Sequence, residues 1–354
     1  MSGNRRSSPL RAITQDLLPA YFAMVMATGI ISIAAAIQGF ALTARLLFYF
    51  NLVAYAVLGL LHGLRLCWFP RRFVADMLDH SRGPGYFTWV ASSAVLGSQF
   101  VVLEQAHRAA LALWILSGIL WLGITYTIFT AFAVKENKPS LPQGINGGWL
   151  LAVVATQAVA VLSAHIAAVW PQPYRLEFNF IALSMWLWGG MLYIWMIALI
   201  FYRYYFFYFS PDDLSPPFWI SMGAMAISTL AGSLLIMNSA DAPYLESLLP
   251  FLKGFTIFYW ATGTWWIPML VLLGIWRHVI KRYPLQYDPQ YWGAVFPLGM
   301  YTAATAQMAA AMEFYFLEAI PQIFLVVSLL AWAVTVLGLS RSMYRHARLY
   351  LRRA

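Results

Sequence analysis

Six histidines and one cysteine are the side chains in this sequence best suited to metal binding, proton relay or nucleophilic chemistry. They are His62, His80, His107, His165, His278, His346 and Cys67. No two histidines have the close spacing of a zinc site, and no Asp or Glu accompanies them inside an apolar stretch. The single cysteine cannot form an internal disulfide. The sequence therefore predicts no metal site, no cofactor and no catalytic residues, and an intramembrane enzyme is only a remote interpretation.

Hydroxyl and amide side chains are the second set of polar groups, and they follow a pattern. They concentrate on five long apolar stretches, whose central turns contain no Lys, Arg, Asp or Glu. Weak dipoles without full charges allow an anion to pass without being held tightly. The hydroxyls that we expect to line such a path are Thr28, Ser92, Ser93, Thr156, Ser228 and Thr302. Alternatively, each hydroxyl bonds back to its own helix four residues earlier.

The elements that must position these groups are membrane-spanning helices. Of the 354 residues, 62% are hydrophobic and only 10% are charged, which is too little charged surface for a soluble domain. A spanning helix needs roughly 20 mostly apolar residues. The predicted spans are 17–39, 43–67, 85–103, 110–134, 145–169, 178–206, 217–239, 250–280, 291–313 and 320–345. We expect an all-α integral membrane protein, with a pore domain over 17–345 between short basic tails at 1–16 and 346–354.

Basic residues are distributed unevenly between the two sets of helix ends. Of the 22 Lys and Arg residues, 18 lie at one set of alternate ends and 4 at the other, whereas the 13 acidic residues divide 7 to 6. An asymmetry confined to Lys and Arg is the positive-inside pattern of a multi-pass membrane protein. It predicts a plasma-membrane protein with both termini in the cytoplasm, and it explains the net charge of +9 without a nucleic-acid partner.

The odd-numbered spans resemble one another. Each has a Pro/Gly-rich entry, then an aromatic residue, then a helix rich in Ala, Gly, Ser and Thr. Aligning Phe22, Phe87, Trp149, Trp219 and Trp292 gives intervals of 65, 62, 70 and 73 residues. Such self-similarity predicts five helical hairpins, with the small-residue helices in a central ring and the bulky even-numbered ones outside. In an alternative interpretation, the small residues serve close packing in a solid bundle.

The five small-residue helices share one direction, because each begins on the predicted cytoplasmic side. Their positive dipole ends, together with the basic loops, would form an anion-attracting mouth. The ninth span, which begins at Tyr291, also carries Pro297, so we expect a kink near Phe296.

Several stretches resemble one known family of membrane proteins. PAYFAMVMATGIIS from Pro19 and YWGAVFPLGMYT from Tyr291 look like the tellurite-resistance/dicarboxylate transporter family. INGGWLLAVVATQ from Ile145 and FYWATGTWWIPMLVLLGIWRH from Phe258 are similar to its bacterial branch. The family includes slow-type anion channels, malate permeases and sulfite efflux pumps. The resemblance covers roughly 17–345 and implies ten helices with quasi-fivefold symmetry around a central pore, commonly in a homotrimer.

The resemblance also implies a gate. In that family a phenylalanine on the ninth helix occludes the middle of the pore, and the matching residue here is Phe296, followed by Pro297. The repeat alignment places four apolar or small residues level with it: Met26, Ala91, Val153 and Gly223. We include Gly299 among the expected lining residues. Alternatively, Phe296 packs between helices as an ordinary core aromatic.

These observations predict an anion channel or transporter whose pore is gated by a phenylalanine. The expected partners are the lipid bilayer and a small anion, namely chloride, nitrate, sulfite, tellurite or a C4-dicarboxylate such as malate. The runner-up is a proton-coupled C4-dicarboxylate transporter, although the spans offer no obvious carboxylate to carry the proton.

Overall fold

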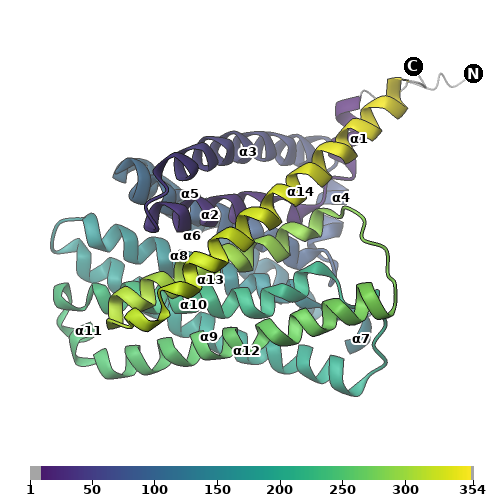
Figure 1. The fold of residues 1–354 in the computed structure, drawn as a ribbon. Helices are drawn as coiled ribbons and strands as arrows, with labels where there is room; N and C mark the ends of the chain where they lie inside the picture. Colours follow the sequence, from purple (N-terminus) through teal and green to yellow (C-terminus); the bar gives the residue numbers. More distant parts are fainter. Residues whose placement is uncertain (1–8, 352–354) are drawn as a thin grey trace, which may run out of the picture.

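The computed structural model describes residues 9–351, which fold into helices with no strand in that range (Figure 1). The inner helices, as they are called below, are α2 (Ala23–Ile37), α5 (Phe87–Glu104), α8 (Leu151–Val169), α10 (Ile220–Met237) and α13 (Trp292–Met312). The outer helices are α3 (Ala41–Trp68), α6 (His107–Val134), α9 (Tyr174–Phe206), α12 (Leu249–Ile275) and α14 (Ala319–Leu351). The short helices are α1 (Pro9–Gln15), α4 (Pro70–Met77), α7 (Leu141–Gly144) and α11 (Pro243–Ser247).

Each inner helix is preceded by a short 3-10 turn. These turns are η1 (Pro19–Phe22), η2 (Gly83–Tyr86), η3 (Gly147–Leu150), η4 (Pro216–Trp219) and η7 (Pro289–Tyr291). Four of these turns have proline at one of their first two residues, where a backbone N–H has no partner within the helix and its loss costs no hydrogen bond. The η3 turn begins with two glycines instead. The Pro/Gly-rich entries of the sequence repeat are therefore helix starts. The remaining turns are η5 (Ser239–Asp241), the π-helical η6 (Trp276–Ile280) and η8 (Tyr315–Leu317).

Nine helices in the described part of the chain are long and apolar enough to cross a membrane. The remaining inner helix, α13, has 21 residues and runs through Pro297 as one helix, but its Pro, Gly, Tyr and Gln residues make it less apolar. The ten-span count therefore stays a prediction. Helix α14 differs from the prediction in length: it continues to Leu351, past the predicted end of the tenth span at 345.

The five inner helices close on one another. Helix α2 packs against α5, α5 against α8, α8 against α10, α10 against α13, and α13 against α2. In the four inner helices that qualify as spans, 78% to 94% of the most apolar window is buried, compared with 17% to 44% in the outer helices. The contacts agree with the predicted inner ring, whereas its fivefold symmetry stays a prediction.

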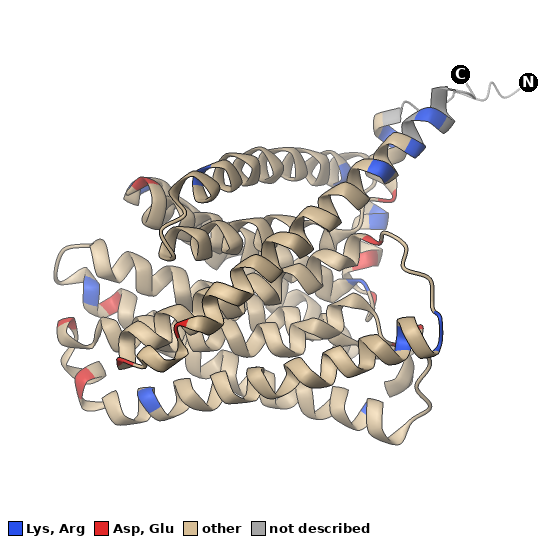
Figure 2. Cartoon of the chain, viewed as in Figure 1, with Lys and Arg blue, Asp and Glu red and all other residues tan. Residues whose placement is uncertain are grey.

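Both ends of the described chain lie at one end of the bundle, which is called the terminal end below (Figure 1). The turns that join each inner helix to its following outer helix lie at the opposite, distal end. Figure 2 shows that Lys, Arg, Asp and Glu gather mainly near these two ends, with few of them on the helices between. Residues 1–8 of the predicted N-terminal tail and 352–354 of the C-terminal tail lie outside the described residues.

Candidate functional site

Phe296 lies on the face of α13 that is turned toward the interior of the ring. On one side of it, the Pro297 ring packs against α10, so that a Cβ added to Gly223 would lie 2.7 Å from Pro297 Cγ. On the other side, Gly299 meets α2, and an added Cβ would lie 2.6 Å from Ile31 Cγ1. A helix advances about 100° per residue, so Phe296 lies between these two contact directions. Its side chain is fully buried.

The opposite face of α13 contacts an outer helix. Trp260 of α12 donates from Nε1 to Thr305 Oγ1 at 3.0 Å, and the Tyr301 hydroxyl lies 2.8 Å from the Thr264 hydroxyl of the same helix. Thr305 is nine residues after Phe296, which places it about half a turn away around the helix. The two faces of α13 therefore differ in chemistry: the outward face is hydrogen-bonded, and the inward face carries an apolar ring.

Three of the hydroxyls predicted to line the path are hydrogen-bonded to outer helices instead. The bonds join Trp332 Nε1 to Thr28 Oγ1 (2.9 Å), Tyr55 Oη to Ser93 Oγ (2.8 Å) and Trp121 Nε1 to Thr156 Oγ1 (2.8 Å). An aromatic N–H or O–H group of the outer layer thus pairs with a hydroxyl of the inner layer. These hydroxyls therefore cross-link the two layers.

The other three predicted hydroxyls bond to their own helices, as the alternative reading of the sequence expected. The acceptors are the Trp89 carbonyl for Ser92 (3.1 Å), the Ala224 carbonyl for Ser228 (2.8 Å) and the Leu298 carbonyl for Thr302 (2.9 Å). All six predicted hydroxyls are therefore satisfied within the protein, and they are buried. A role for these six hydroxyls in lining a path stays a prediction.

The layer predicted around Phe296 is formed only in part. Met26 and Ala91 each lie two residues before an outward hydroxyl, Thr28 or Ser93, so they are turned about 200° away from the outer helix and face the ring. Gly223 touches Pro297 directly. In α8, by contrast, Val153 is three residues before the outward Thr156 and so lies only about 60° from it. Val154, one residue later, faces the ring in its place.

The inward faces also carry polar groups that are absent from the predicted set. His165 is nine residues after Thr156 and lies on the opposite face of α8. Gln307 is eleven residues after Phe296 and shares its face on α13. Both side chains are partly exposed, although most of their neighbours along the helix are buried. The helical spacing from Thr156 and Phe296 is the sequence signal that could have identified them.

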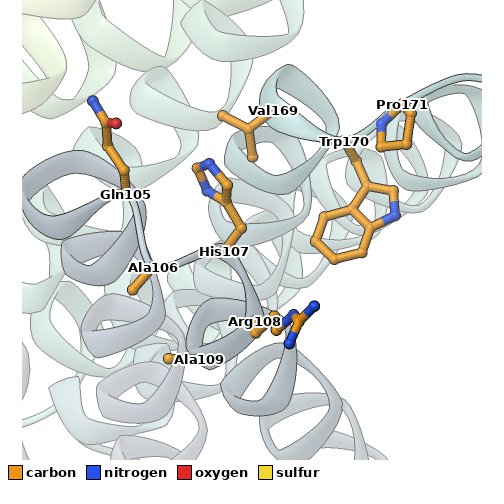
Figure 3. Close-up of a pocket in the computed structure, with 8 residues that line it drawn as sticks. All are labelled: Gln105, Ala106, His107, Arg108, Ala109, Val169, Trp170 and Pro171. Carbon is orange, nitrogen blue, oxygen red and sulfur yellow. The ribbon is translucent and has the colours of Figure 1, made fainter.

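Two hollows lie toward the distal end. One of about 720 Å³ lies between the α5–α6 and α8–α9 turns, and Figure 3 shows the His107, Arg108 and Trp170 side chains around it. The other, of about 730 Å³, is lined by the α2–α3 turn, α13 and α14 and includes Gln38 and Glu318. Neither is lined by Phe296. Phe296 and the inward side chains level with it are buried in this structure.

The inward face of the ring combines an apolar layer with a few polar side chains. Over residues 9–351, no group of three His, Cys, Asp or Glu side chains could hold a metal ion. The inward positions named above are one phenylalanine, small or apolar residues, one imidazole and one amide. A narrow apolar layer of this kind is typical of a hydrophobic gate, which opens when its plug moves and water enters.

Comparisons with known proteins agree with this description. A family model described as "SLAC1: Voltage-dependent anion channel" matches residues 16–339. An uncharacterized membrane protein of Mycobacterium tuberculosis is 37% identical over 148 residues, which are 42% of this chain and 75% of that protein. An uncharacterized transporter of Methanocaldococcus jannaschii is 24% identical over 342 residues, covering 94% of this chain and 95% of the relative.

A eukaryotic relative has a more specific description. A sulfite efflux pump of Arthroderma benhamiae is 24% identical over 339 residues, which are 89% of this chain and 88% of the pump.

Proposed function

Since this chain belongs to the SLAC1 family of voltage-dependent anion channels, we propose that it moves small anions across a membrane through the ring of inner helices, with Phe296 as the gate. The family consists of channels and transporters, which supports a transport role and not an enzymatic one. In this proposal α13, the ninth predicted span, also crosses the membrane and brings the number of spans to ten, and it carries the gate in the inner ring.

The position of Phe296 is the observation that carries the proposal. Its fully buried ring lies between the Pro297–Gly223 contact and the Gly299–Ile31 contact, on the inward face of α13. Gly223 and Ala91 have little or no side chain to oppose a rotation of the phenyl ring. Rotation would leave a water-sized gap in the apolar layer, and hydration of such a gap is what allows an ion to pass.

The proposed path is apolar at the gate and polar toward the distal end. His165 and Gln307 would there give an anion hydrogen-bond donors after it has passed Phe296. The common N-terminal direction of the five inner helices would attract anions at the terminal end.

The proposed cargo is a small anion from the set chloride, nitrate, sulfite, tellurite and C4-dicarboxylates. Sulfite has the support of the fungal relative, which is a sulfite efflux pump aligned over 89% of this chain. We propose a multi-pass protein of the plasma membrane with both termini in the cytoplasm, as the bias of Lys and Arg indicates. We also propose a homotrimer with one path in each subunit, as the resemblance given in the sequence analysis implies.

A flux assay in proteoliposomes tests the proposal. Phe296→Ala should raise the flux of chloride, nitrate, sulfite or malate by about tenfold or more over wild type, because the plug of the apolar layer is removed. The matched control is Phe48→Ala, since Phe48 is equally buried but packs on Phe100 between α3 and α5, with ring centroids 5.3 Å apart. Equal flux from the two variants would refute the gate, and flux that follows an imposed pH gradient would instead support proton-coupled transport.

A further inference from the structure

A cluster of buried polar side chains lies at the terminal end, between the inner and outer layers. We call Arg65, Asp76, Arg82, Tyr86 and Trp89 the Arg65 cluster. Arg65 is in the last turn of outer helix α3 and is only 2% exposed, and Asp76 is in α4. Tyr86 and Trp89 come from η2 and the first turn of inner helix α5. The cluster thus lies outside the ring whose interior Phe296 faces.

The charges of the cluster do not cancel. Arg65 donates from Nη2 to Asp76 Oδ2 at 2.5 Å, and Arg82 donates from Nη1 to Asp76 Oδ1 at 3.0 Å. One carboxylate is therefore shared by two guanidinium groups. The Arg82 side chain is about half exposed and so is partly compensated by solvent, but Arg65 is not. An excess of one positive charge remains beside a buried arginine.

Several N–H groups of the cluster have no acceptor. Arg65 Nε and Nη1 and Trp89 Nε1 are buried without a hydrogen-bond partner. The neighbouring His62 contacts the Leu58 carbonyl through Nδ1 at 2.9 Å, so Nδ1 carries the proton of the neutral ring, and its Nε2 is a buried acceptor without a partner. The Tyr86 hydroxyl donates to the Phe73 carbonyl. Buried donors without acceptors are rare in proteins, and each calls for an explanation such as a bound water or ion.

Aromatic rings surround these donors. The rings of Phe73, Tyr86 and Trp89 touch one another, with centroids 5.0, 5.4 and 5.8 Å apart, and His62 meets Trp89 edge-on at 4.9 Å. The Tyr86 hydroxyl also lies within hydrogen-bond reach of the Arg65 side chain and within electrostatic reach of Asp76. An anion accepts hydrogen bonds from these donors and also neutralises the excess positive charge, which a water molecule would not do. The chemistry favours a small anion.

We propose that the Arg65 cluster binds a small monovalent anion such as chloride or nitrate at the terminal end, held by Arg65 Nε and Nη1 and Trp89 Nε1. This site joins α3 and α4 to the start of α5, so the bound anion stabilises the contact between one outer and one inner helix. The proposal concerns binding and does not depend on conduction through the ring.

Thermal unfolding of the full-length protein in detergent tests it, with chloride replaced by gluconate at constant ionic strength. Chloride should raise the melting temperature of wild type. Trp89→Phe keeps the aromatic ring but removes the Nε1 donor, and should weaken the apparent chloride affinity about tenfold, as expected for loss of one charge-assisted bond. Trp332→Phe is the matched control, because its Nε1 already bonds to Thr28. It should keep the full chloride effect.

Two further arms separate this site from the proposed path. In Phe296→Ala, chloride should still raise the melting temperature as much as in wild type, because Phe296 is not in the cluster. This result is expected whatever the variant does to anion flux. The second arm uses crystals of the wild-type protein grown in bromide and so needs no variant. A bromide anomalous peak within hydrogen-bond distance of Trp89 Nε1 and Arg65 would support the proposal. Equal melting temperatures of wild type in chloride and gluconate, an undiminished effect in Trp89→Phe, or no bromide at the cluster would overturn it.

Discussion

Gly147 in the inner layer and Gly118 in the outer layer have very different surroundings. A Cβ added to Gly147, in the η3 turn before α8, would lie 2.5 Å from the Pro217 carbonyl oxygen and 2.7 Å from Phe218 Cα. A Cβ added to Gly118, in the middle of α6, would meet no atom within 4 Å. The inner layer uses glycine to bring backbones together, whereas this outer glycine has open space around it. The comparison indicates that the inner layer is rigid and the outer surface is free to meet lipid.

Polar groups extend this comparison to the hydrogen bonds between the layers. Inner-layer hydroxyls such as Thr28 and Thr156 accept from Trp332 and Trp121 of the outer layer. These bonds hold each inner helix in a fixed rotation about its axis. The fixed rotation in turn keeps Phe296 and the other inward residues directed into the ring.

The largest effect on stability is expected from substitution of the inner glycine. Gly147→Ala should lower the free energy of unfolding by about 3 kcal/mol, because the new methyl group meets backbone atoms that cannot move aside. Gly118→Ala should raise it by roughly 0.5–1 kcal/mol through the better helix propensity of alanine. Thermal melting in detergent measures both. Similar melting temperatures for the two variants would show that the layers are packed alike.

A smaller effect is expected from removing one cross-link between the layers. Thr156→Val keeps the side-chain shape but leaves Trp121 Nε1 buried without an acceptor, which should cost about 1–3 kcal/mol. Thr262→Val in α12 is the control, since the Thr262 hydroxyl bonds only to the Phe258 carbonyl of its own helix. We expect a change within about 0.5 kcal/mol there.

The same pair of variants also separates the two roles considered for Thr156. A cross-linking hydroxyl predicts that Thr156→Val leaves anion flux per folded molecule unchanged. If anion flux instead falls strongly in Thr156→Val and not in Thr262→Val, the Thr156 hydroxyl contacts the passing anion.

The smallest effect is expected at the loop that leads from α4 to the inner helix α5. Burial against Phe132, whose ring lies 4.0 Å from that of His80, lowers the pKa of His80 below its usual value of 6.5, and Lys135 lowers that pKa further. The folded protein therefore favours neutral His80, so its contribution to stability is present above about pH 6.5 and is lost as the pH falls below that value. His80→Phe should melt with a weaker dependence on pH between about 7.5 and 5.5. An unchanged pH dependence would contradict this.

The sequence was sufficient to predict the helical hairpins and the two layers, because small-residue and bulky helices alternate along the chain. It could not predict which way each hydroxyl faces. An inner helix such as α8 is buried on all sides, so its apolar pattern has no polar face to indicate its rotation. The rotation becomes visible only through partners such as Trp121 and Thr156, which are 35 residues apart in the chain.

The proposed gate residue and the ninth predicted span illustrate two limits of what the sequence can predict. Phe296 was found through family resemblance and repeat alignment, and its inward position depends on contacts that Pro297 and Gly299 make with other helices. The same alignment selected Val153 where the structure turns Val154 inward, because a one-residue error changes the facing direction by about 100°. The Pro and Gly residues that place Phe296 in α13 also help to make this helix less apolar than the other four inner helices.

The most direct test of the account is the accessibility of single cysteines to a water-soluble, negatively charged thiol reagent. The background is Cys67→Ser with Phe296→Ala, which removes the exposed native thiol and opens the proposed gate. Ala303→Cys lies seven residues after Phe296, on the same inward face, and should react and block anion flux. Thr305→Cys lies on the face that contacts Trp260 and should stay unmodified. Equal modification of both cysteines, or modification of Thr305→Cys alone, would contradict a path through the ring of inner helices.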